Sequence, residues 1–202
     1  MLDFEQGLWE KGFRLVAGVD EAGRGPLAGP VVACAVVLPA WTSVPGLDDS
    51  KRLSPSRREE LYDVVRKVAS AVSVARAEPE EIDLLNIHNA TLLAMKRALE
   101  GLDLRPDYVL VDGKFLPEVD LPGEAVVGGD GRSACIAAAS VVAKVERDRL
   151  MAEYDRIYPQ YGFAKHKGYP TPEHLRALRE HGPCPIHRLS FRGVKDVSDD
   201  AP

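Results

Sequence analysis

The chain has 202 residues, of which 45% are hydrophobic and 28% are charged, and its formal net charge at pH 7 is −5. This length favours one domain with a core that needs no disulfide or metal ion to fold. The acidic balance excludes binding of nucleic acid through overall basicity, because phosphate neutralisation needs clustered Lys and Arg. Three scattered cysteines without a C-x-x-C pair, and no leader-like or membrane-spanning stretch, predict a cytoplasmic protein without membrane association.

The hydrophobic pattern predicts an α/β fold with a mixed sheet. Expected strands span residues 14–19, 30–38, 71–77, 108–111 and 125–127. Expected helices span residues 55–68, 86–102 and 136–158, and another begins near residue 171. Ser54 is a suitable N-cap for the first helix, and Pro55 suits its first position.

The composition changes after the longest predicted helix. Residues 159–202 are rich in Gly, Pro, His and Tyr, and we expect them to form a small helical appendage. Residues 1–158 are expected to form the catalytic core, and both parts are expected to belong to one folding unit. Residues 194–202, which include three aspartates, are typical of a frayed tail.

Acidic residues stand where predicted strands end. Asp20 and Glu21 end the first strand, Asp112 ends the strand 108–111, and Asp130 follows the last strand. Catalytic groups gather at strand ends in α/β sheets, so neighbouring strands would bring four carboxylates together. Such a cluster suits Mg²⁺ or Mn²⁺, with two ions about 3.5–4 Å apart for in-line phosphoryl displacement.

A simpler interpretation of these acids stays open. Asp is common at strand ends because it forms turns, so Asp112 or Asp130 alone could be a turn residue. Successive strand residues point to opposite faces, so Asp20 and Glu21 can share a site only if the backbone turns or bulges there.

Two further features are compatible with a phosphate-containing substrate. Gly23, Arg24 and Gly25 follow the first carboxylates, and glycines let backbone N–H groups approach a ligand, although a plain hairpin turn explains them too. Tyr169 stands among cations on an expected loop, as sugar or base stacking would require, although packing into the core explains it equally well.

Charge is distributed unevenly along the chain. Residues 144–195 contain 11 basic and 6 acidic residues, whereas the remainder contains 15 basic and 25 acidic residues. An acidic body with a basic C-terminal part fits a nuclease that grips a nucleic-acid backbone with one region and holds metal in the other. Solvated helix faces with paired charges account for part of this pattern.

Taken together, the motifs resemble those of bacterial ribonuclease HII, in family order from about residue 14 to residue 192. They are Gly-Val-Asp-Glu-Ala-Gly-Arg-Gly-Pro-Leu-Ala-Gly-Pro-Val from Gly18, Leu-Asp-Asp-Ser-Lys from Leu47, Leu53-Ser54, Asn-Ile-His from Asn86, Val-Asp-Gly from Val111, Gly129-Asp130, Ile-Ala-Ala-Ala-Ser-Val-Val-Ala-Lys-Val from Ile136, Arg147-Asp148, His-Lys-Gly-Tyr from His166, His187-Arg188 and Ser190-Phe191.

The resemblance implies a ribonuclease H-like fold with a mixed five-stranded sheet, and hydrolysis of RNA in RNA–DNA hybrids. It also implies cutting 5′ of ribonucleotides embedded in duplex DNA, which leaves 3′-hydroxyl and 5′-phosphate ends and removes ribonucleotides from DNA. The matching metal-binding catalytic residues are Asp20, Glu21, Asp112 and Asp130. The matching substrate-binding residues are Gly23, Arg24 and Gly25 at the ribose 2′-hydroxyl, Lys51 near phosphates, and Tyr169 on the neighbouring sugar.

The chain departs from the family pattern at two positions. Gly128 replaces a frequent lysine and Cys135 replaces a frequent serine, which puts fine substrate positioning in doubt but not the activity class. Asp148 belongs to the family's Arg-Asp pair, although a salt bridge within the helix explains it as well.

Two other functions remain open. One is an integrase- or resolvase-like DNA nuclease that uses the same carboxylates without selecting ribose, and the other is a non-catalytic hybrid-binding module. We expect a monomer, and contact with a replication clamp is left open.

Overall fold

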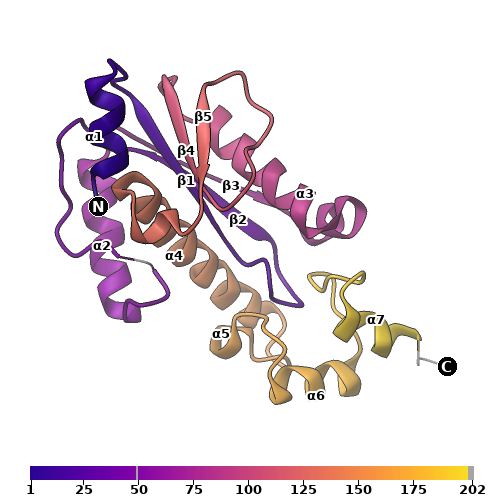
Figure 1. The fold of residues 1–202 in the computed structure, drawn as a ribbon. Coiled ribbons are helices and arrows are strands. Elements are labelled where there is room, and N and C mark those ends of the chain that lie inside the picture. The colour runs from indigo at the N-terminus through magenta and orange to yellow at the C-terminus, as the bar shows by residue number, and fades with distance from the viewer. Residues whose placement is uncertain (49, 200–202) are drawn as a thin grey trace.

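The computed structural model describes residues 1–48 and 50–199 and contains one mixed sheet with helices on both faces (Figure 1). Within these residues the sheet has five strands in the order β3-β2-β1-β4-β5. The strands are β1 Val16–Ala22, β2 Val31–Val37, β3 Ala71–Ala77, β4 Tyr108–Asp112 and β5 Gly123–Val126. The pairs β1–β2 and β2–β3 are antiparallel, and the pairs β1–β4 and β4–β5 are parallel. The predicted α/β fold with a mixed five-stranded sheet is confirmed.

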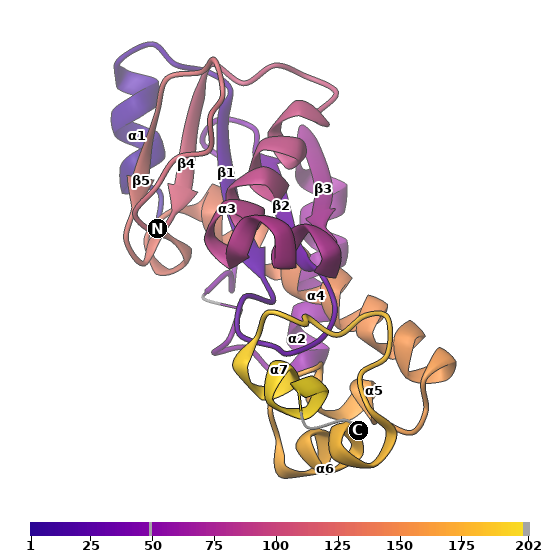
Figure 2. The same ribbon diagram turned by 90° about the vertical axis from the view of Figure 1, so that its right-hand side faces the viewer.

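The helices form two layers around the sheet and a separate group below it (Figures 1 and 2). They are α1 Asp3–Glu10, α2 Pro55–Val68, α3 Pro79–Glu100, α4 Ala134–Ile157, α5 Phe163–His166, α6 Pro172–His181 and α7 Arg192–Asp199, with a 3₁₀ turn at Gly129–Gly131. Helix α3 packs on one face of the sheet, and α1, α2 and α4 pack on the other. Every residue of β2 is buried, as expected for a strand covered on both faces. None of the described helices is long and apolar enough to cross a membrane.

Local sequence signals explain where several helices begin. Ser54 caps α2 by accepting a hydrogen bond from the backbone N–H of Arg57 at 3.2 Å, as predicted. Thr171 caps α6 in the same way, through the N–H of His174 at 3.2 Å. In both helices a proline follows the cap, where its missing N–H has no helical partner to lose.

The structure corrects three boundaries. Helix α1 was not predicted, and the residues 194–199 of the predicted frayed tail belong to α7, with Val194 fully buried. Residues 200–202 of that tail lie outside the described residues. Helix α3 begins at Pro79 rather than Asn86, because two helices join at a kink where Asn86 has φ of 68°. The predicted helix start is nonetheless visible, since the Asn86 side chain accepts the N–H groups of His88 and Asn89.

The C-terminal segment packs against the core through a small apolar cluster of its own. Phe163 and Leu178 meet Leu27 and Ala28 of the loop after β1, together with Met151 of α4. The backbone N–H of Leu27 also donates to Gly168 O at 2.8 Å, and the N–H of Arg188 donates to Leu27 O at 2.8 Å. That residues 1–158 and 159–202 form one folding unit stays a prediction.

The long helix α4 lies unusually close to β1. A Cβ atom on Gly18 would lie 2.1 Å from the backbone carbonyl carbon of Cys135. Only glycine lets strand and helix approach to this distance, and this approach holds the start of α4 against the middle of β1.

We expect Gly18→Ala to destabilise the fold by about 1–3 kcal/mol, because the new methyl group meets backbone that cannot move aside cheaply. Urea unfolding would measure this change. Gly7→Ala is the matched control, since a Cβ there meets nothing within 4 Å and lies inside α1. It should stabilise the protein by about 0.5–1 kcal/mol. Equal midpoints for both variants would contradict the packing argument.

Candidate active site

Three carboxylates meet where β1 and β4 end. One oxygen from each of Asp20, Asp112 and Asp130 lies within 4.8 Å of the other two. Since β1 and β4 are parallel neighbours, their C-terminal ends bring Asp20 and Asp112 to the same edge of the sheet. Asp130 arrives from the 3₁₀ turn that precedes α4. The structure thus brings together three of the four predicted carboxylates.

Each member of this triad is held by a specific contact. Asp112 Oδ1 accepts the N–H of Gly129 at 2.7 Å, which ties the end of β4 to the turn that carries Asp130. Asp130 Oδ2 lies 3.7 Å from Lys51 Nζ. Asp20 Oδ1 accepts the N–H of Glu21 at 2.7 Å. Lys51 therefore reaches the site predicted for it, although Asp49 of the same motif lies outside the described residues.

The surroundings of Asp20 disfavour its ionised form. Burial raises the pKa of Asp20 well above its ordinary value, and the charges of Glu21 and Asp112 raise it further. The hydroxyl of Ser140, on α4, opposes this shift by donating a hydrogen bond to Asp20, and Ser140 Oγ also lies 2.7 Å from Ser50 Oγ. A buried group of negative charges with few compensating donors is a site that favours cations.

Glu21 lies beside the triad. The pairing of β1 with β2 is regular through Ala22, yet the Glu21 carboxyl group forms a side-chain hydrogen bond with that of Asp20. Burial raises the pKa of Glu21, the Arg24 guanidinium opposes this shift, and the charge of Asp112 adds to it. Glu21 Oε1 lies 3.4 Å from Arg24 Nη1. The role of Glu21 as a metal ligand stays a prediction.

The donor set fits a hard divalent cation. Three carboxylates offer only oxygen atoms, which are the ligands that Mg²⁺ and Mn²⁺ prefer. Two of them, Asp20 and Asp130, are buried, so a bound cation would offset both the burial and the repulsion that raise the pKa of Asp20. The triad can therefore hold a divalent metal ion.

The loop between β1 and β2 is clamped by two buried arginines. Arg188 donates to four carbonyl oxygens of this loop, those of Gly23, Arg24, Pro26 and Gly29, at 2.5–3.0 Å. Arg147, on α4, donates to the carbonyls of Ala28, Pro30 and Lys167 at 3.0–3.1 Å. With the carbonyls turned inward to the guanidinium groups, the loop is fixed by charge-assisted hydrogen bonds.

This clamp explains the first glycine of the loop. Gly23 has φ of +100°, and a Cβ there would lie 2.0 Å from Arg147 Nε. Burial lowers the pKa of Arg147 to about 10 and that of Arg188 to about 9, and both groups keep their charge at neutral pH. Two positive charges therefore lie directly beneath the loop.

Tyr169 lies next to the glycine loop with its side chain 45% exposed. Its ring carbon Cε1 lies 3.4 Å from the place where a Cβ of Gly25 would be. The interpretation that Tyr169 packs in the core is therefore wrong. Gly25, Arg24 and Tyr169 are all exposed on one surface that adjoins the triad through Glu21.

Sequence reasoning assigned no role to several residues that shape this site. Arg147 and Arg188 stood in quoted motifs, but a sequence does not show that a guanidinium is buried against carbonyls. Glu5 had no signal at all. It is fully buried, and its Oε1 accepts Ser133 Oγ at 2.6 Å and the N–H of Cys135 at 2.9 Å, which fixes the start of α4.

The residues with open roles are now placed. Asp148 pairs with Lys144 at 2.6 Å, four residues earlier on α4, and lies 4.0 Å from Arg58 Nη2, so the salt-bridge explanation holds. Arg58 in turn donates to the carbonyls of Ser50 and Leu53, which flank Lys51. Cys135 is buried in the core, so its thiol is not exposed to substrate. Gly128 adopts a left-handed conformation before the 3₁₀ turn.

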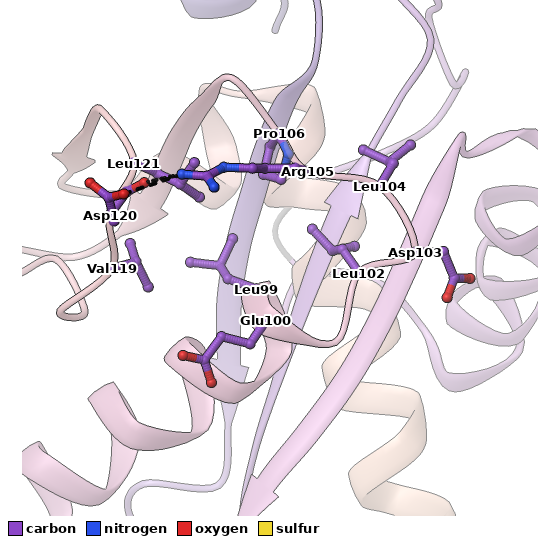
Figure 3. Close-up of a pocket in the computed structure, with 10 residues that line it drawn as sticks. All are labelled: Leu99, Glu100, Leu102, Asp103, Leu104, Arg105, Pro106, Val119, Asp120 and Leu121. Carbon is purple, nitrogen blue, oxygen red and sulfur yellow. Dashed lines mark hydrogen bonds and ion pairs between the residues drawn. The ribbon is translucent and has the colours of Figure 1, made fainter.

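A separate pocket lies away from the carboxylates (Figure 3). It is bordered by the end of α3, the loop that leads into β4, and the segment before β5, and Leu102, Leu104 and Leu121 line it. The loop enters β4 at the opposite end from Asp112. This pocket therefore contributes nothing to the triad.

Comparison with known proteins identifies the family of this arrangement. The profile of Ribonuclease HII matches residues 17–194. Ribonuclease HII of Polaromonas sp. (strain JS666) is 60% identical over 183 residues, which cover 91% of this chain and 92% of that protein. Ribonuclease HII of Geotalea daltonii is 54% identical over 196 residues, which cover 97% of this chain and 91% of that protein.

Solved structures agree with this relationship. Ribonuclease H2 from Pyrococcus horikoshii OT3 has a TM-score of 0.79 at 27% identity, covering 91% of this chain and 97% of that chain. The RNase HII in a PCNA complex from Archaeoglobus fulgidus has a TM-score of 0.72 at 28% identity, covering 88% and 95%. By profile, sequence identity and fold, the chain belongs to the ribonuclease HII family and is a metal-dependent ribonuclease H endonuclease.

Proposed function

We propose that this enzyme cuts RNA–DNA hybrids, and duplex DNA on the 5′ side of embedded ribonucleotides, with two divalent ions held by Asp20, Glu21, Asp112 and Asp130. The observation that carries the proposal is the juxtaposition of a carboxylate triad with an exposed glycine loop and an exposed tyrosine. The triad can serve as the site of hydrolysis, and the glycine loop and the Tyr169 ring form a surface that can bind the sugar and recognise its 2′-hydroxyl. A ribonuclease needs both functions.

The carboxylates position the reacting groups. Asp20, Glu21, Asp112 and Asp130 would hold two divalent ions, which would supply a water nucleophile at neutral pH and offset the charge on the leaving 3′ oxygen. Asp20 and Asp112 are fixed by β1 and β4, whose hydrogen-bonded pairing limits their movement. The N–H of Gly129 orients one oxygen of Asp112 and leaves the other for coordination. The products have 3′-hydroxyl and 5′-phosphate ends.

In this proposal, the backbone of residues 23–25 selects ribose by binding its 2′-hydroxyl. The 2′-hydroxyl both donates and accepts hydrogen bonds, and it is the group that separates a ribonucleotide from its DNA neighbours. Because Arg188 engages the carbonyls of Gly23 and Arg24 from within, the opposite side of the loop is free to face a ligand. The buried positive charges beneath the loop favour the adjoining phosphate.

Tyr169 and Lys51 complete the proposed substrate surface. The Tyr169 ring would stack on the sugar next to the ribonucleotide, and a 2′-hydroxyl on that sugar would clash with the stacked ring. Lys51 is 76% exposed at its side chain and would bind a phosphate near Asp130. The Lys51 ammonium group lies 3.7 Å from Asp130, which is close enough to the triad to bind the phosphate that is cleaved.

The choice between Mg²⁺ and Mn²⁺, a monomeric state and a cytoplasmic location stay predictions. The relative from Archaeoglobus fulgidus is described in a complex with PCNA. We extend contact with a replication clamp to this chain only as a proposal, together with a role in removing ribonucleotides during DNA replication and repair.

The decisive test compares three duplexes: one with a single ribonucleotide, one with an RNA–DNA hybrid tract, and one of DNA alone. We expect cleavage of the first two in Mg²⁺ or Mn²⁺, and 5′ of the ribonucleotide in the first. Asp112→Asn should lower cleavage by at least about 10³-fold, because it removes a charge at the reacting centre. Equal cleavage of the DNA control would favour a DNA nuclease, and full activity of Asp112→Asn would favour a binding module.

Metal binding should also appear in thermal stability. Without divalent ions, the raised pKa of Asp20 means that the folded protein binds a proton more tightly than the unfolded chain. The contribution of Asp20 to the free energy of unfolding therefore declines as pH rises above the ordinary pKa of an Asp side chain. Asp112→Asn should reduce this decline. Mn²⁺ at 100 times its dissociation constant should stabilise the wild type by about 2.7 kcal/mol.

Thermal melts with and without Mn²⁺ at several pH values measure both effects. Asp103→Asn is the control, since Asp103 is exposed in the loop before β4. It should leave the response to Mn²⁺ unchanged. An identical response in Asp112→Asn would show that the ion binds elsewhere.

Arg188→Met should weaken both activity and stability. The substitution leaves four carbonyls without their guanidinium donor, which we expect to cost about 1–3 kcal/mol, and it frees the loop that reads ribose. The ratio of cleavage between ribonucleotide and DNA substrates should fall. Arg105→Met, at an exposed site before β4, is the control. An unchanged ratio in Arg188→Met would mean that the clamp does not serve selectivity.

A further inference from the structure

A group of buried histidines lies directly beneath Tyr169. His166 belongs to α5, His174 to α6, and His187 to the loop after α6, and all three are buried. The rings of His166 and His174 stack with centroids 4.5 Å apart and planes 14° apart. The proposed metal site and the loop clamp use none of these side chains.

The contacts of His174 determine which of its nitrogens carries a proton. Nδ1 lies 2.9 Å from the carbonyl oxygen of Tyr169, which can only accept, so Nδ1 must carry the proton. In a neutral ring Nε2 is then an acceptor. Its partner is His187 Nε2 at 3.0 Å, which must therefore be the donor.

The same reasoning extends to His187. With its proton on Nε2, Nδ1 accepts, and the backbone N–H of Cys184 donates to it at 2.9 Å. The nearby carbonyl of Cys184 already accepts the backbone N–H of His187 at 2.9 Å. The hydrogen bonds thus run in one direction, from the N–H of Cys184 through His187 and His174 to the carbonyl of Tyr169.

A proton added to either ring would break this chain. A proton on His187 Nδ1 would place this N–H against the backbone N–H of Cys184. A proton on His174 Nε2 would place two N–H groups against each other between the rings. The other titratable groups around the pair are His166, the Cys184 thiol and the Tyr161 ring, while the adjoining Arg188 turns its guanidinium to the loop carbonyls. None of these groups is a carboxylate that would favour a charged ring, and burial lowers the pKa of His187 to about 4.

Both backbone polar groups of Tyr169 are held by this region. Its carbonyl accepts from His174 and also from the N–H of Thr171 at 2.8 Å, and its N–H donates to His166 O at 2.9 Å. The side chain is 45% exposed and lies against Gly25 of the loop. The backbone hydrogen bonds fix the point from which the ring extends.

We propose that His174 and His187 form a neutral, one-directional hydrogen-bond relay that fixes the backbone of Tyr169 and so places its ring against the substrate sugar. This inference rests on the proposed stacking role of Tyr169. Both histidines are positioning residues, since neither is exposed to substrate.

The test is a double-mutant cycle on the duplex with a single ribonucleotide. We expect His174→Phe, which keeps an aromatic ring and removes both nitrogens, to lower kcat/KM by about tenfold. In a Tyr169→Ala background the same substitution should have no further effect, because there is no ring left to place. An equal loss in both backgrounds would overturn the relay, since damage to the appendage alone would act irrespective of residue 169.

Two variants separate positioning from folding. His174→Asn keeps an N–H group near Tyr169 O and should recover most of the activity lost in His174→Phe. His181→Phe, on the exposed side of the same helix, is the matched control and should behave as wild type. If His174→Phe does not fold, His187→Asn replaces it in the cycle, because Asn can still accept from the N–H of Cys184. No recovery in His174→Asn would overturn the proposal.

Two measurements are independent of cleavage. ¹⁵N NMR of the imidazoles at pH 7 should show His174 protonated at Nδ1 and His187 protonated at Nε2, and the reverse tautomers or a charged ring would overturn the relay. Because the folded pKa of His187 is lowered, wild-type stability should fall as pH falls from about 6.5 towards about 4, and less so in His187→Asn. Equal pH dependence in the two proteins would contradict the relay.

These results distinguish the relay from the proposed function. If Tyr169→Ala cleaves as the wild type does, the stacking role is wrong and the relay loses its effect on catalysis, whatever the NMR shows. If Tyr169→Ala is impaired and His174→Phe is not, stacking stands and the relay is overturned.

Discussion

The burial of two guanidinium groups against backbone carbonyls is the constraint on which the substrate surface depends. Arg147 and Arg188 belong to α4 and to the C-terminal segment, yet both hold the loop between β1 and β2. That loop begins directly after Asp20 and Glu21. Its position therefore links the carboxylates to Tyr169 more directly than the sheet does. A change in either arginine would disturb the loop that joins the carboxylate triad to Tyr169.

Charge separation follows from the same arrangement. Burial raises the pKa of Asp20, and the charges of Glu21 and Asp112 raise it further, while the guanidinium groups of Arg147 and Arg188 lie beneath the adjoining loop without a carboxylate among their described hydrogen-bond partners. The carboxylate triad lacks positive charge, and the loop above the two arginines lacks negative charge. A phosphodiester accompanied by divalent cations would supply both, because its phosphates suit the loop and its counterions suit the triad. The net acidity of the chain is thus compatible with a polyanionic substrate.

The sequence predicted regular features better than irregular ones. Strand and helix patterns, the cap at Ser54, the helix start near residue 171, and the meeting of Asp20 with Asp112 follow from periodicity, capping preferences and parallel pairing. Helix α1 was missed because its stabilising contact, Glu5 with the start of α4, joins residues that are 128–130 positions apart in the sequence. The buried arginines and the histidine relay were equally invisible, since their meaning depends on burial and on which atoms face each other.

Hydrogen bonds between Arg188 and the loop span sequence separations of 159–165 residues. Contacts of such long range close late, because the chain must first lose the entropy of the intervening loop. The carboxylates all lie within residues 20–130 and need no part of the appendage to adjoin one another. In a growing or refolding chain, we therefore expect the capacity to bind a cation to arise before the capacity to recognise ribose.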